Sequence, residues 1–292
     1  MTKIAVIIAS IGRPRNVANL LDRLGAQTLP PSAIILSSVA SSDVPPVEGR
    51  APRPKVVLGP RGLPAQRNTG LDALEDMPDL IAFFDDDYLP SRFCLEHMAA
   101  LFARHPDLVG ANGRLLADGI NGSGVSDAEA ASLIAAYDAD PSPDLSIRKR
   151  LTGLYGCNMA YRFAAIGATR FDERLKLYGW QEDIDFAAQL RAKGFLAKTD
   201  AFAGVHQGVK GARTSGLRLG YSQVVNPVYL ARKGTMDWLF ALELMGRNIL
   251  ANHLRLLQPE PWIDRAGRAK GNWIGLKDML SGRIEPERIE SL

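Results

Sequence analysis

Three consecutive aspartates, Asp85, Asp86 and Asp87, are the residues of this sequence with the clearest chemical potential. They follow an apolar stretch, Leu80 to Phe84, that is typical of a strand buried on both faces. Ligands of open α/β sheets bind where such a strand leaves the sheet. Because side chains alternate along an extended chain, we expect Asp85 and Asp87 to point the same way and Asp86 the opposite way. Two converging carboxylates suit a hard divalent cation such as Mg²⁺ or Mn²⁺.

A structural explanation of the same acids stays open. The stretch from Asp85 to Pro90 could be a solvated turn before a helix that begins at Ser91. Acids next to a helix N-terminus interact favourably with the helix dipole, with no ligand involved.

A second acidic group, Glu182, Asp183 and Asp185, lies at the start of a predicted helix directly after Trp180. The helix is predicted from apolar residues on one face and from Gly194, which ends it. Acids in this position are also ordinary helix caps, worth about 0.3 to 1 kcal/mol each. The sequence alone therefore leaves a capping role and a chemical role open.

His206 follows a predicted strand and precedes a polar, glycine-rich and basic loop that contains Lys210 and Arg213. Most lone histidines are structural, but this loop is able to move and to bind anions. A second glycine-containing segment, residues 59–70, carries Arg61 and Arg67 and could approach a phosphate. That segment by itself is more often a plain turn.

Strands and helices alternate along the chain, which predicts a sheet of mainly parallel strands joined by helical crossovers. The expected strands and the helices between them come from apolar runs and their spacing. Residues 118–150 change to glycine, serine, alanine and aspartate, and we interpret them as an insertion near the mouth of the site or as a partly mobile loop. A capping box predicts a short helix from Ser126 to about Tyr137 inside it. The expected strands are Ile4 to Ala9, Ala33 to Val39, Lys55 to Leu58, Asp79 to Asp87, Leu108 to Leu116 and Leu154 to Tyr161, with two short extended runs within Phe195 to Val205.

The composition is that of an ordinary globular protein of 292 residues, with 46% hydrophobic and 23% charged residues. Its net charge of +3 gives no indication of a nucleic-acid partner. Cys94 and Cys157 are too few for a disulfide framework or a zinc site, so we expect a reducing cytoplasm. The short apolar N-terminus is interpreted as the first strand and not as a signal peptide.

The C-terminal part of the chain is predicted to be helical from Ser222 onward. The apolar stretch from Met236 to Leu257 is interrupted by Arg247 and Arg255, which argues against a membrane-spanning helix. Packing against the core or a partner is the first interpretation. Peripheral contact with the inner face of the membrane is the second.

Together these residues resemble family 2 glycosyltransferases with the GT-A fold, over roughly residues 3–233. The resemblance implies a Rossmann-like, mixed and mainly parallel sheet flanked by helices. It implies a GT-A catalytic domain at 1–220, with a nucleotide-sugar half at 1–117, the insertion at 118–150 and an acceptor half at 151–220, followed by a helical extension at 221–292. The matching segments are Ser10 to Pro14, Gln66 to Gly70, Asp85 to Asp87, Gly156 to Arg162, Trp180 to Phe186, and His206 with its loop.

The resemblance also implies metal-dependent, inverting transfer of a hexosyl group from a nucleoside diphosphate sugar to a hydroxyl acceptor, in polysaccharide or glycoconjugate synthesis. The apolar, basic C-terminal segment leads us to expect a glycan or lipid-linked acceptor. Asp85, Asp87 and His206 would hold Mg²⁺ or Mn²⁺. Asp183 would be the general base, with Trp180 and Glu182 at the acceptor. The donor would be bound by Ser10, Arg13, Arg67, Asp85, Asp86, Lys210 and Arg213.

Two departures and two alternatives qualify this resemblance. Many family members carry an acid directly after the second strand to hold the nucleotide base, whereas the first acid here is Asp43. The Gln-x-x-Arg-Trp signature of processive synthases is absent, which favours single addition. A sugar nucleotidyltransferase is one alternative, although residues 10–15 hold a single glycine. A non-catalytic carbohydrate-binding or scaffold protein on the same fold is the other.

Overall fold

The computed structural model describes residues 1–210 and 215–292. These residues form two compact units, each described here by itself. The first unit comprises residues 1–61, 66–170 and 190–210, and the second comprises 62–65, 171–189 and 215–292. The sheet and the three aspartates belong to the first unit.

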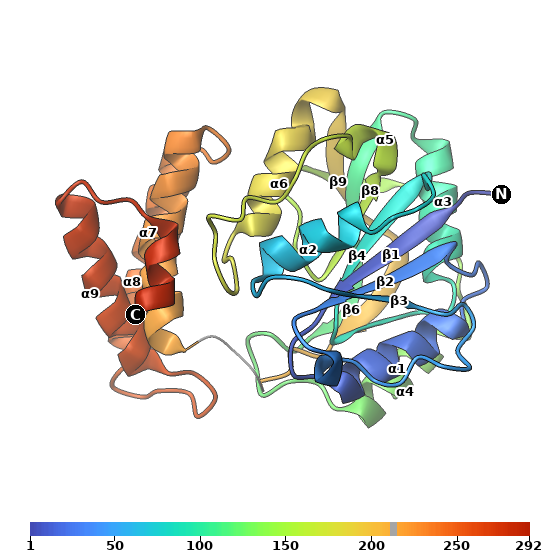
Figure 1. Cartoon of the computed structure of the whole chain (residues 1–292), viewed down its shortest axis with the longest axis horizontal. Helices are drawn as coiled ribbons and strands as arrows, with labels where there is room; N and C mark the ends of the chain where they lie inside the picture. The colour runs from blue at the N-terminus through green and yellow to red at the C-terminus, as the bar shows by residue number, and fades with distance from the viewer. Residues whose placement is uncertain (211–214) are drawn as a thin grey trace. The chain divides into compact units, whose positions relative to one another are not determined.

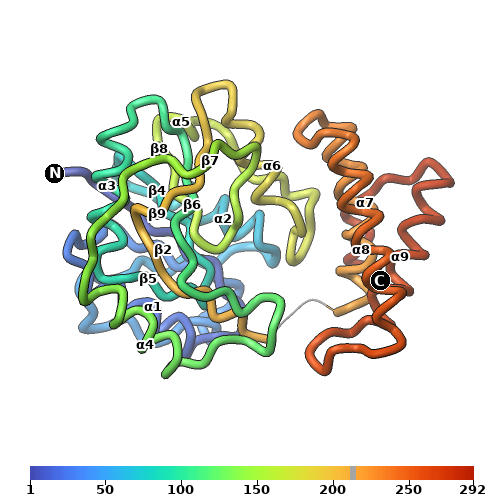
Figure 2. Tube along the Cα trace, turned by 180° about the vertical axis from the view of Figure 1, so that it is seen from behind, coloured from blue at the N-terminus to red at the C-terminus, as the bar shows by residue number. Residues whose placement is uncertain are grey.

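A mixed sheet of nine strands forms the centre of the first unit within the described residues (Figure 1). Its strand order is β3-β2-β1-β4-β8-β6-β9-β5, and β7, which is labelled in Figure 2, pairs with β9. The strands β3, β2, β1, β4, β6 and β9 run in one direction, and β8, β5 and β7 run in the other. The fold is thus mixed α/β and mostly parallel, as predicted. The strands are β1 (Ile4–Ala9), β2 (Ala33–Ser38), β3 (Lys55–Leu58), β4 (Leu80–Asp85), β5 (Tyr88–Pro90), β6 (Leu108–Asp118), β7 (Ile147–Leu151), β8 (Asn158–Arg162) and β9 (Phe195–His206).

The order in which the chain adds strands to the sheet reverses at β1. From β1 the chain proceeds through β2 to β3 on one side and then returns to place β4 on the other side. In this register Ala9 lies beside Ser37 on one neighbouring strand and beside Asp85 on the other. The carboxyl ends of β1, β2 and β4 therefore meet at a topological switch point, where open sheets bind ligands.

Alternate apolar residues of β1 and β4 face helices on opposite sides of the sheet. On one face Val6, Ile8 and Phe84 pack in a single core cluster with α1 (Pro14–Gly25) and α3 (Cys94–Arg104). On the other face α2 (Leu63–Asp72) comes so close that a Cβ on its Gly70 would lie 2.4 Å from a methyl carbon of Ile7. Burial on both faces explains why these strands are continuously apolar.

The segment 118–150 is structured over much of its length. The predicted capping box is confirmed, since the Ser126 Oγ accepts a hydrogen bond from the Glu129 amide at 3.2 Å at the start of α4 (Asp127–Asp138). Ala130 and Ile134 of α4 pack against Val205 of β9. The segment also supplies β7, which the sequence did not predict because three of its five residues are charged and exposed.

The second unit is built on α7 (Gly216–Lys233), which packs against both α8 (Trp238–Leu254) and α9 (Arg265–Leu280). Glycines permit the close contact with α9: a Cβ on Gly220 would lie 2.1 Å from the Arg268 carbonyl oxygen, and one on Gly271 would lie 2.0 Å from that of Leu217. The unit also contains most of α6 (Glu182–Leu190) and the short helix η3 (Pro286–Ser291). None of the helices in the described ranges combines the length and apolarity that crossing a bilayer requires. Three shorter helices complete the chain: η1 (Ser41–Asp43), α5 (Phe163–Ile166) and η2 (Arg191–Lys193).

Several boundaries differ from those expected. The strand expected at Leu154 to Tyr161, for example, spans Asn158–Arg162. The central strand ends at Asp85 rather than Asp87, because Asp86 and Asp87 form a turn that lets β5 pair antiparallel with β9. Helix α7 begins at Gly216, six residues before the predicted start, with Ser215 as its N-cap: the Ser215 Oγ accepts from the Arg218 amide at 3.3 Å.

Candidate metal and donor site

Asp85, Asp87 and His206 lie together at the carboxyl end of the sheet. One potential ligand atom from each residue falls within 4.8 Å of the others. Asp85 is the last residue of β4, Asp87 lies in the turn that follows, and His206 ends β9. The turn places Tyr88 opposite His206 in the β5–β9 pair, which explains how residues so distant in sequence meet.

Asp87 is held by backbone and side-chain groups. Its Oδ1 lies 3.3 Å from the His206 Nε2, and its Oδ2 accepts a hydrogen bond from the Val209 amide at 2.8 Å. The Arg13 guanidinium lies 3.7 Å from the same Oδ2. Asp87 is therefore fixed with one oxygen directed at the imidazole.

Asp85 is oriented by Arg67. The Arg67 Nη2 donates to the Asp85 Oδ1 at 2.9 Å and to the Gly156 carbonyl oxygen at 3.0 Å. The Arg67 side chain is 3% exposed, whereas that of Asp85 is 32% exposed. The predicted contact of Arg67 with the donor stays a prediction, and the observed contacts are those of a residue that positions a carboxylate.

Asp86 points to different partners from those of its two neighbours. Its Oδ2 accepts from the Ser10 Oγ at 2.6 Å, and its Oδ1 accepts from the Arg13 Nη1 at 2.9 Å. Ser10 and Asp86 are both buried. Ser10, Arg13 and Asp86 were all predicted to bind the donor, and the structure places them in one network that joins the first loop of the fold to the acidic turn.

The charges of this group shift its proton affinities. Burial raises the pKa of Asp86 to about 6, in spite of the adjacent Arg13. Burial acts in the same direction on Asp87, but the hydrogen bond from His206 and the nearby Arg13 hold the pKa of Asp87 below its usual value. Burial opposes the charge on His206, yet the carboxylates of Asp118 and Asp87 raise its pKa to about 10.

The group fits a divalent cation by its chemistry. Two carboxylates and an imidazole form a ligand set that oxygen- and nitrogen-binding divalent metals accept. The imidazolium now lies between carboxylates, where a metal would replace its proton. The partial exposure of Asp85 leaves that side of the group accessible to a ligand.

The loop that follows His206 is anchored to the segment 118–150 at its start. The Lys210 Nζ donates to the carbonyl oxygens of Gly119 at 2.8 Å and Ile120 at 2.9 Å. Lys210 was predicted to bind donor phosphates, and in this structure it caps the start of that segment. Arg213, the other basic residue predicted there, lies outside the described residues.

Sequence reasoning missed three residues that support the site. Asp118 and Tyr155 both contact the His206 Nδ1, at 2.8 and 3.2 Å. Asp43 accepts hydrogen bonds from the backbone amides of Gly12 and Ala40, each at 2.8 Å, and so joins the loops after β1 and β2. A lone acid after a predicted strand was the signal available for Asp43 and Asp118.

The residues predicted to act on the acceptor lie at the start of α6, in the other compact unit. Two non-glycine residues near them, Leu177 and Gln181, have positive φ values of 58° and 75°. Such conformations persist where surrounding contacts impose them, and they cluster at functional sites. Trp180, Glu182 and Asp183 are thus presented by an unusual backbone.

Contacts of this segment with α7 and with the residues directly after α7 hold that backbone in place. Asp185, fully buried, accepts hydrogen bonds from the Lys233 Nζ at 2.8 Å and the Thr235 Oγ1 at 2.6 Å. The Trp180 carbonyl oxygen accepts from the Asn226 Nδ2 at 2.8 Å. Of the acids in this segment, Asp185 therefore has a structural role. The Asp183 Oδ1 accepts from the Ile184 amide at 2.8 Å, as a first-turn acid does.

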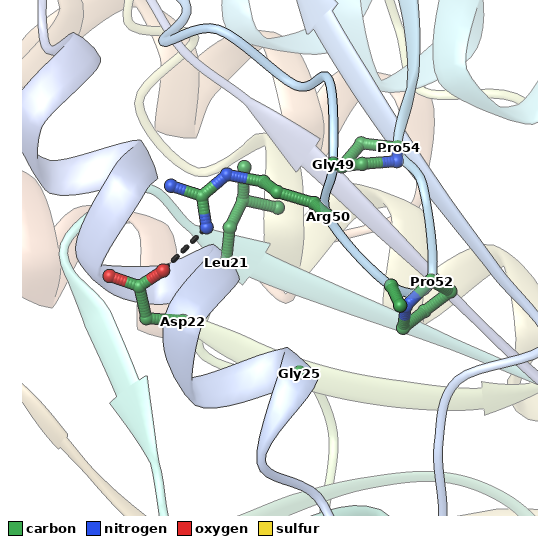
Figure 3. Close-up of a pocket in the computed structure, with 8 residues that line it drawn as sticks. Leu21, Asp22, Gly25, Gly49, Arg50, Pro52 and Pro54 are labelled. Carbon is green, nitrogen blue, oxygen red and sulfur yellow. Dashed lines mark hydrogen bonds and ion pairs between the residues drawn. The ribbon is translucent and has the colours of Figure 1, made fainter.

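A surface hollow elsewhere in the first unit contains none of the predicted site residues (Figure 3). It lies between α1 and the segment 49–54, and the Arg50 Nη1 donates to the Asp22 Oδ1 across it at 2.5 Å. The hollow has no acidic cluster and no unpaired buried cation among its lining residues, and we assign it no chemistry.

Solved structures of similar fold were found by comparison. The chain matches TarS of S. aureus, residues 1–349 with UDP bound, at 17% identity and a TM-score of 0.55, over 100% of this chain and 83% of that one. It covers 44% of the longer TarS chain. It also matches the mannosyltransferase PcManGT of Pyrobaculum calidifontis, solved with GDP-Man and Mn²⁺, at 13% identity and a TM-score of 0.55, over 94% of this chain and 87% of that one. At these identities the likeness establishes the fold, which is GT-A.

The sequence itself carries a family match. No curated protein sequence matches the chain. The family model "Glycosyl transferase family 2" matches residues 5–169, more than half of the chain, including β1, the acidic turn and the strand β8. With the fold and the placement of the aspartates, this match establishes that the chain belongs to glycosyl transferase family 2.

Proposed function

We propose that this glycosyltransferase moves a hexosyl group from a nucleoside diphosphate sugar to a hydroxyl acceptor, with inversion and with Mg²⁺ or Mn²⁺ as cofactor. The observation that carries the proposal is the convergence of Asp85, Asp87 and His206 within 4.8 Å, in a chain of family 2. Bound there, the metal would stabilise the negative charge that develops on the departing diphosphate.

The residues around the acidic turn would hold the donor at the switch point of the sheet. Asp85, held by Arg67 and partly exposed, would face the position of the bound donor. Ser10, Arg13 and Asp86 fix the loop that follows β1, which borders that position. Lys210 and Arg213 belong to the basic segment after β9, and we propose that they contact the diphosphate when donor is bound.

Asp183 is the proposed general base. It would take the proton of the acceptor hydroxyl while the acceptor oxygen bonds to the anomeric carbon and the bond from that carbon to the diphosphate breaks on the opposite face. Trp180 and Glu182 would shape the acceptor pocket. The supporting observation is the constrained backbone at Leu177 and Gln181, since such strain is typical of functional segments.

We further propose that the acceptor is a glycan or a lipid-linked sugar, that the enzyme acts in polysaccharide or glycoconjugate synthesis, and that it works in the cytoplasm with peripheral contact at the inner face of the membrane. Support for the last point comes from apolar residues of the α8 segment that lie exposed at helical spacing. These residues are Leu239, Leu242, Leu250 and Leu254 of α8, and Leu257 lies exposed three residues after the helix ends.

The test is thermal unfolding of the full chain with UDP, GDP, dTDP and CMP, each with and without Mn²⁺. A ligand at about 100 times its dissociation constant stabilises by roughly 2.7 kcal/mol. For a chain of this size that is a rise in melting temperature of about 4 to 5 °C. We expect one diphosphate to give this rise, and only with metal.

Asp87→Ala should abolish the metal-dependent rise, whereas Asp72→Ala, which removes an exposed ion pair with Arg170, should keep it. Transfer assays with the sugar donor of the stabilising nucleotide then test the activity itself. The absence of any metal-dependent stabilisation, together with the absence of donor hydrolysis, would favour the scaffold alternative.

A further inference from the structure

The side of His206 that faces away from the aspartates is held by a carboxylate. The Asp118 Oδ1 lies 2.8 Å from the His206 Nδ1, while the His206 Nε2 faces Asp87. The two residues are direct partners in the parallel pairing of β6 with β9. The sheet therefore fixes the distance between them.

Asp118 is itself fixed by its surroundings. Its Oδ1 also accepts a hydrogen bond from the Ile120 amide at 3.1 Å. The Tyr155 hydroxyl lies 3.2 Å from the same imidazole nitrogen, and the two rings meet edge to face with their centres 5.8 Å apart. Because the His206 side chain is only 4% exposed, these contacts restrict the imidazole to one orientation.

Backbone hydrogen bonds join the segment after Asp118 to the end of β9. The Gly119 amide donates to the His206 carbonyl oxygen, and the Val125 amide donates to that of Gln207, each at 2.8 Å. The Gln207 Nε2 donates to the Asp127 Oδ1 at 2.9 Å. The start of the 118–150 segment and the end of β9 thus form one rigid corner.

We infer that Asp118 is a positioning residue for the metal site: by accepting the Nδ1 hydrogen of His206, it keeps the Nε2 lone pair directed toward Asp85 and Asp87. A histidine ligand binds metal through one nitrogen, and the partner of the other nitrogen sets its tautomer and orientation. This inference rests on the metal role in the proposed function. It also gives the 118–150 segment a function, because its first residue supports a ligand.

Removal of Asp118 should weaken metal binding without removing a ligand. Loss of such an outer partner typically lowers metal affinity by about 10- to 100-fold. We expect a loss in this range for Asp118→Ala. In Asp118→Asn an amide oxygen remains to accept from the Nδ1 hydrogen and the Ile120 amide, so most of the affinity should return.

The experiment measures Mn²⁺ affinity of the full chain by titration of the free-ion electron paramagnetic resonance signal, with no donor present. The matched control is Asp127→Ala, which removes a carboxylate of the same segment that contacts Gln207 but not His206. A second readout is the two-bond ¹H–¹⁵N spectrum of the histidines with Mg²⁺, with His206 assigned by comparison with His206→Ala. We expect a proton on Nδ1 in the wild type and in Asp118→Asn, and a changed tautomer in Asp118→Ala.

The outcomes separate this inference from the proposed function. Equal Mn²⁺ affinities and one tautomer in the wild type and Asp118→Ala would overturn the inference and leave the metal site intact. A loss in Asp127→Ala as large as that in Asp118→Ala would also overturn it, because the effect would then come from the corner as a whole. A wild-type chain that binds neither Mn²⁺ nor Mg²⁺ would overturn both the inference and the metal role in the proposed function. Metal binding without sugar transfer would count against the proposed activity alone.

Discussion

The pH dependence of metal binding tests the arrangement around His206 most directly. In the metal-free protein Asp118 and Asp87 raise the pKa of His206 to about 10 against the burial that opposes its charge. Below that pH the imidazole is protonated, and the lone pair that a metal requires is occupied. A metal must therefore displace one proton, so its apparent affinity rises with pH.

The expected magnitude follows from this competition. Each pH unit below the pKa lowers the apparent affinity about tenfold, so we expect a gain of about 100-fold between pH 6.5 and 8.5. The same raised pKa stabilises the metal-free fold fully below the unfolded pKa of about 6.5, and this contribution is lost as the pH rises toward 10. Metal binding and folding should thus respond to pH in opposite directions in this range.

Isothermal titration of Mn²⁺ in two buffers of different ionisation enthalpy gives both the affinity and the number of protons released. We expect close to one proton per metal for the wild type at pH 7 and almost none for His206→Gln. His253→Gln, a change in α8 of the other unit, is the control and should match the wild type. A flat affinity across this pH range, with no proton released by the wild type, would refute the assignment of His206 as a ligand.

Two further expectations concern other parts of the chain. Asp183→Asn should lower kcat by about 10² to 10⁴ and leave donor affinity nearly unchanged, because a base acts in the transition state; wild-type turnover in steady-state assays would exclude the assignment. Gly220→Ala should lower the free energy of unfolding by about 1 to 3 kcal/mol, since the added Cβ would meet a carbonyl oxygen of α9 at 2.1 Å. Both this variant and its control, Gly246→Ala, are measured by urea unfolding. Gly246 lies in open space on α8, so its replacement should be neutral or stabilising by up to about 1 kcal/mol. An equal loss of stability in both variants would disprove the packing argument.

Much of the sheet could be predicted from the sequence because its strands are buried on both faces. A continuous apolar run such as Ile4 to Ala9 indicates a strand that is buried on both faces, and the observed strand has the same bounds. The fold class followed from the alternation of such runs with helices. The C-terminal part was predicted to be helical, but the bounds of α9 within it were not, because its glycines and the exposed Trp273 leave no clear apolar face.

The candidate site was predictable only where the signal is local. Asp85 and Asp87 follow a strand directly, and His206 also ends one. His206 and Asp118 are 88 positions apart in the sequence. Their contact could not be predicted, because the spacing of apolar residues does not indicate which strands become neighbours in the sheet. In the same way, the sequence indicates that Arg67 is basic, but only the fold shows that its charge is directed at Asp85.

The charges around the acidic turn have a consequence for the order in which ligands arrive. Asp85, Asp86, Asp87 and Asp118 face the guanidinium groups of Arg13 and Arg67 and the imidazolium of His206, which leaves one negative charge in excess. A diphosphate that approached this group would be repelled. Exchange of the imidazolium proton for a divalent cation removes the excess. With the proposed metal at this site, the electrostatics therefore favour binding of the metal before the nucleotide.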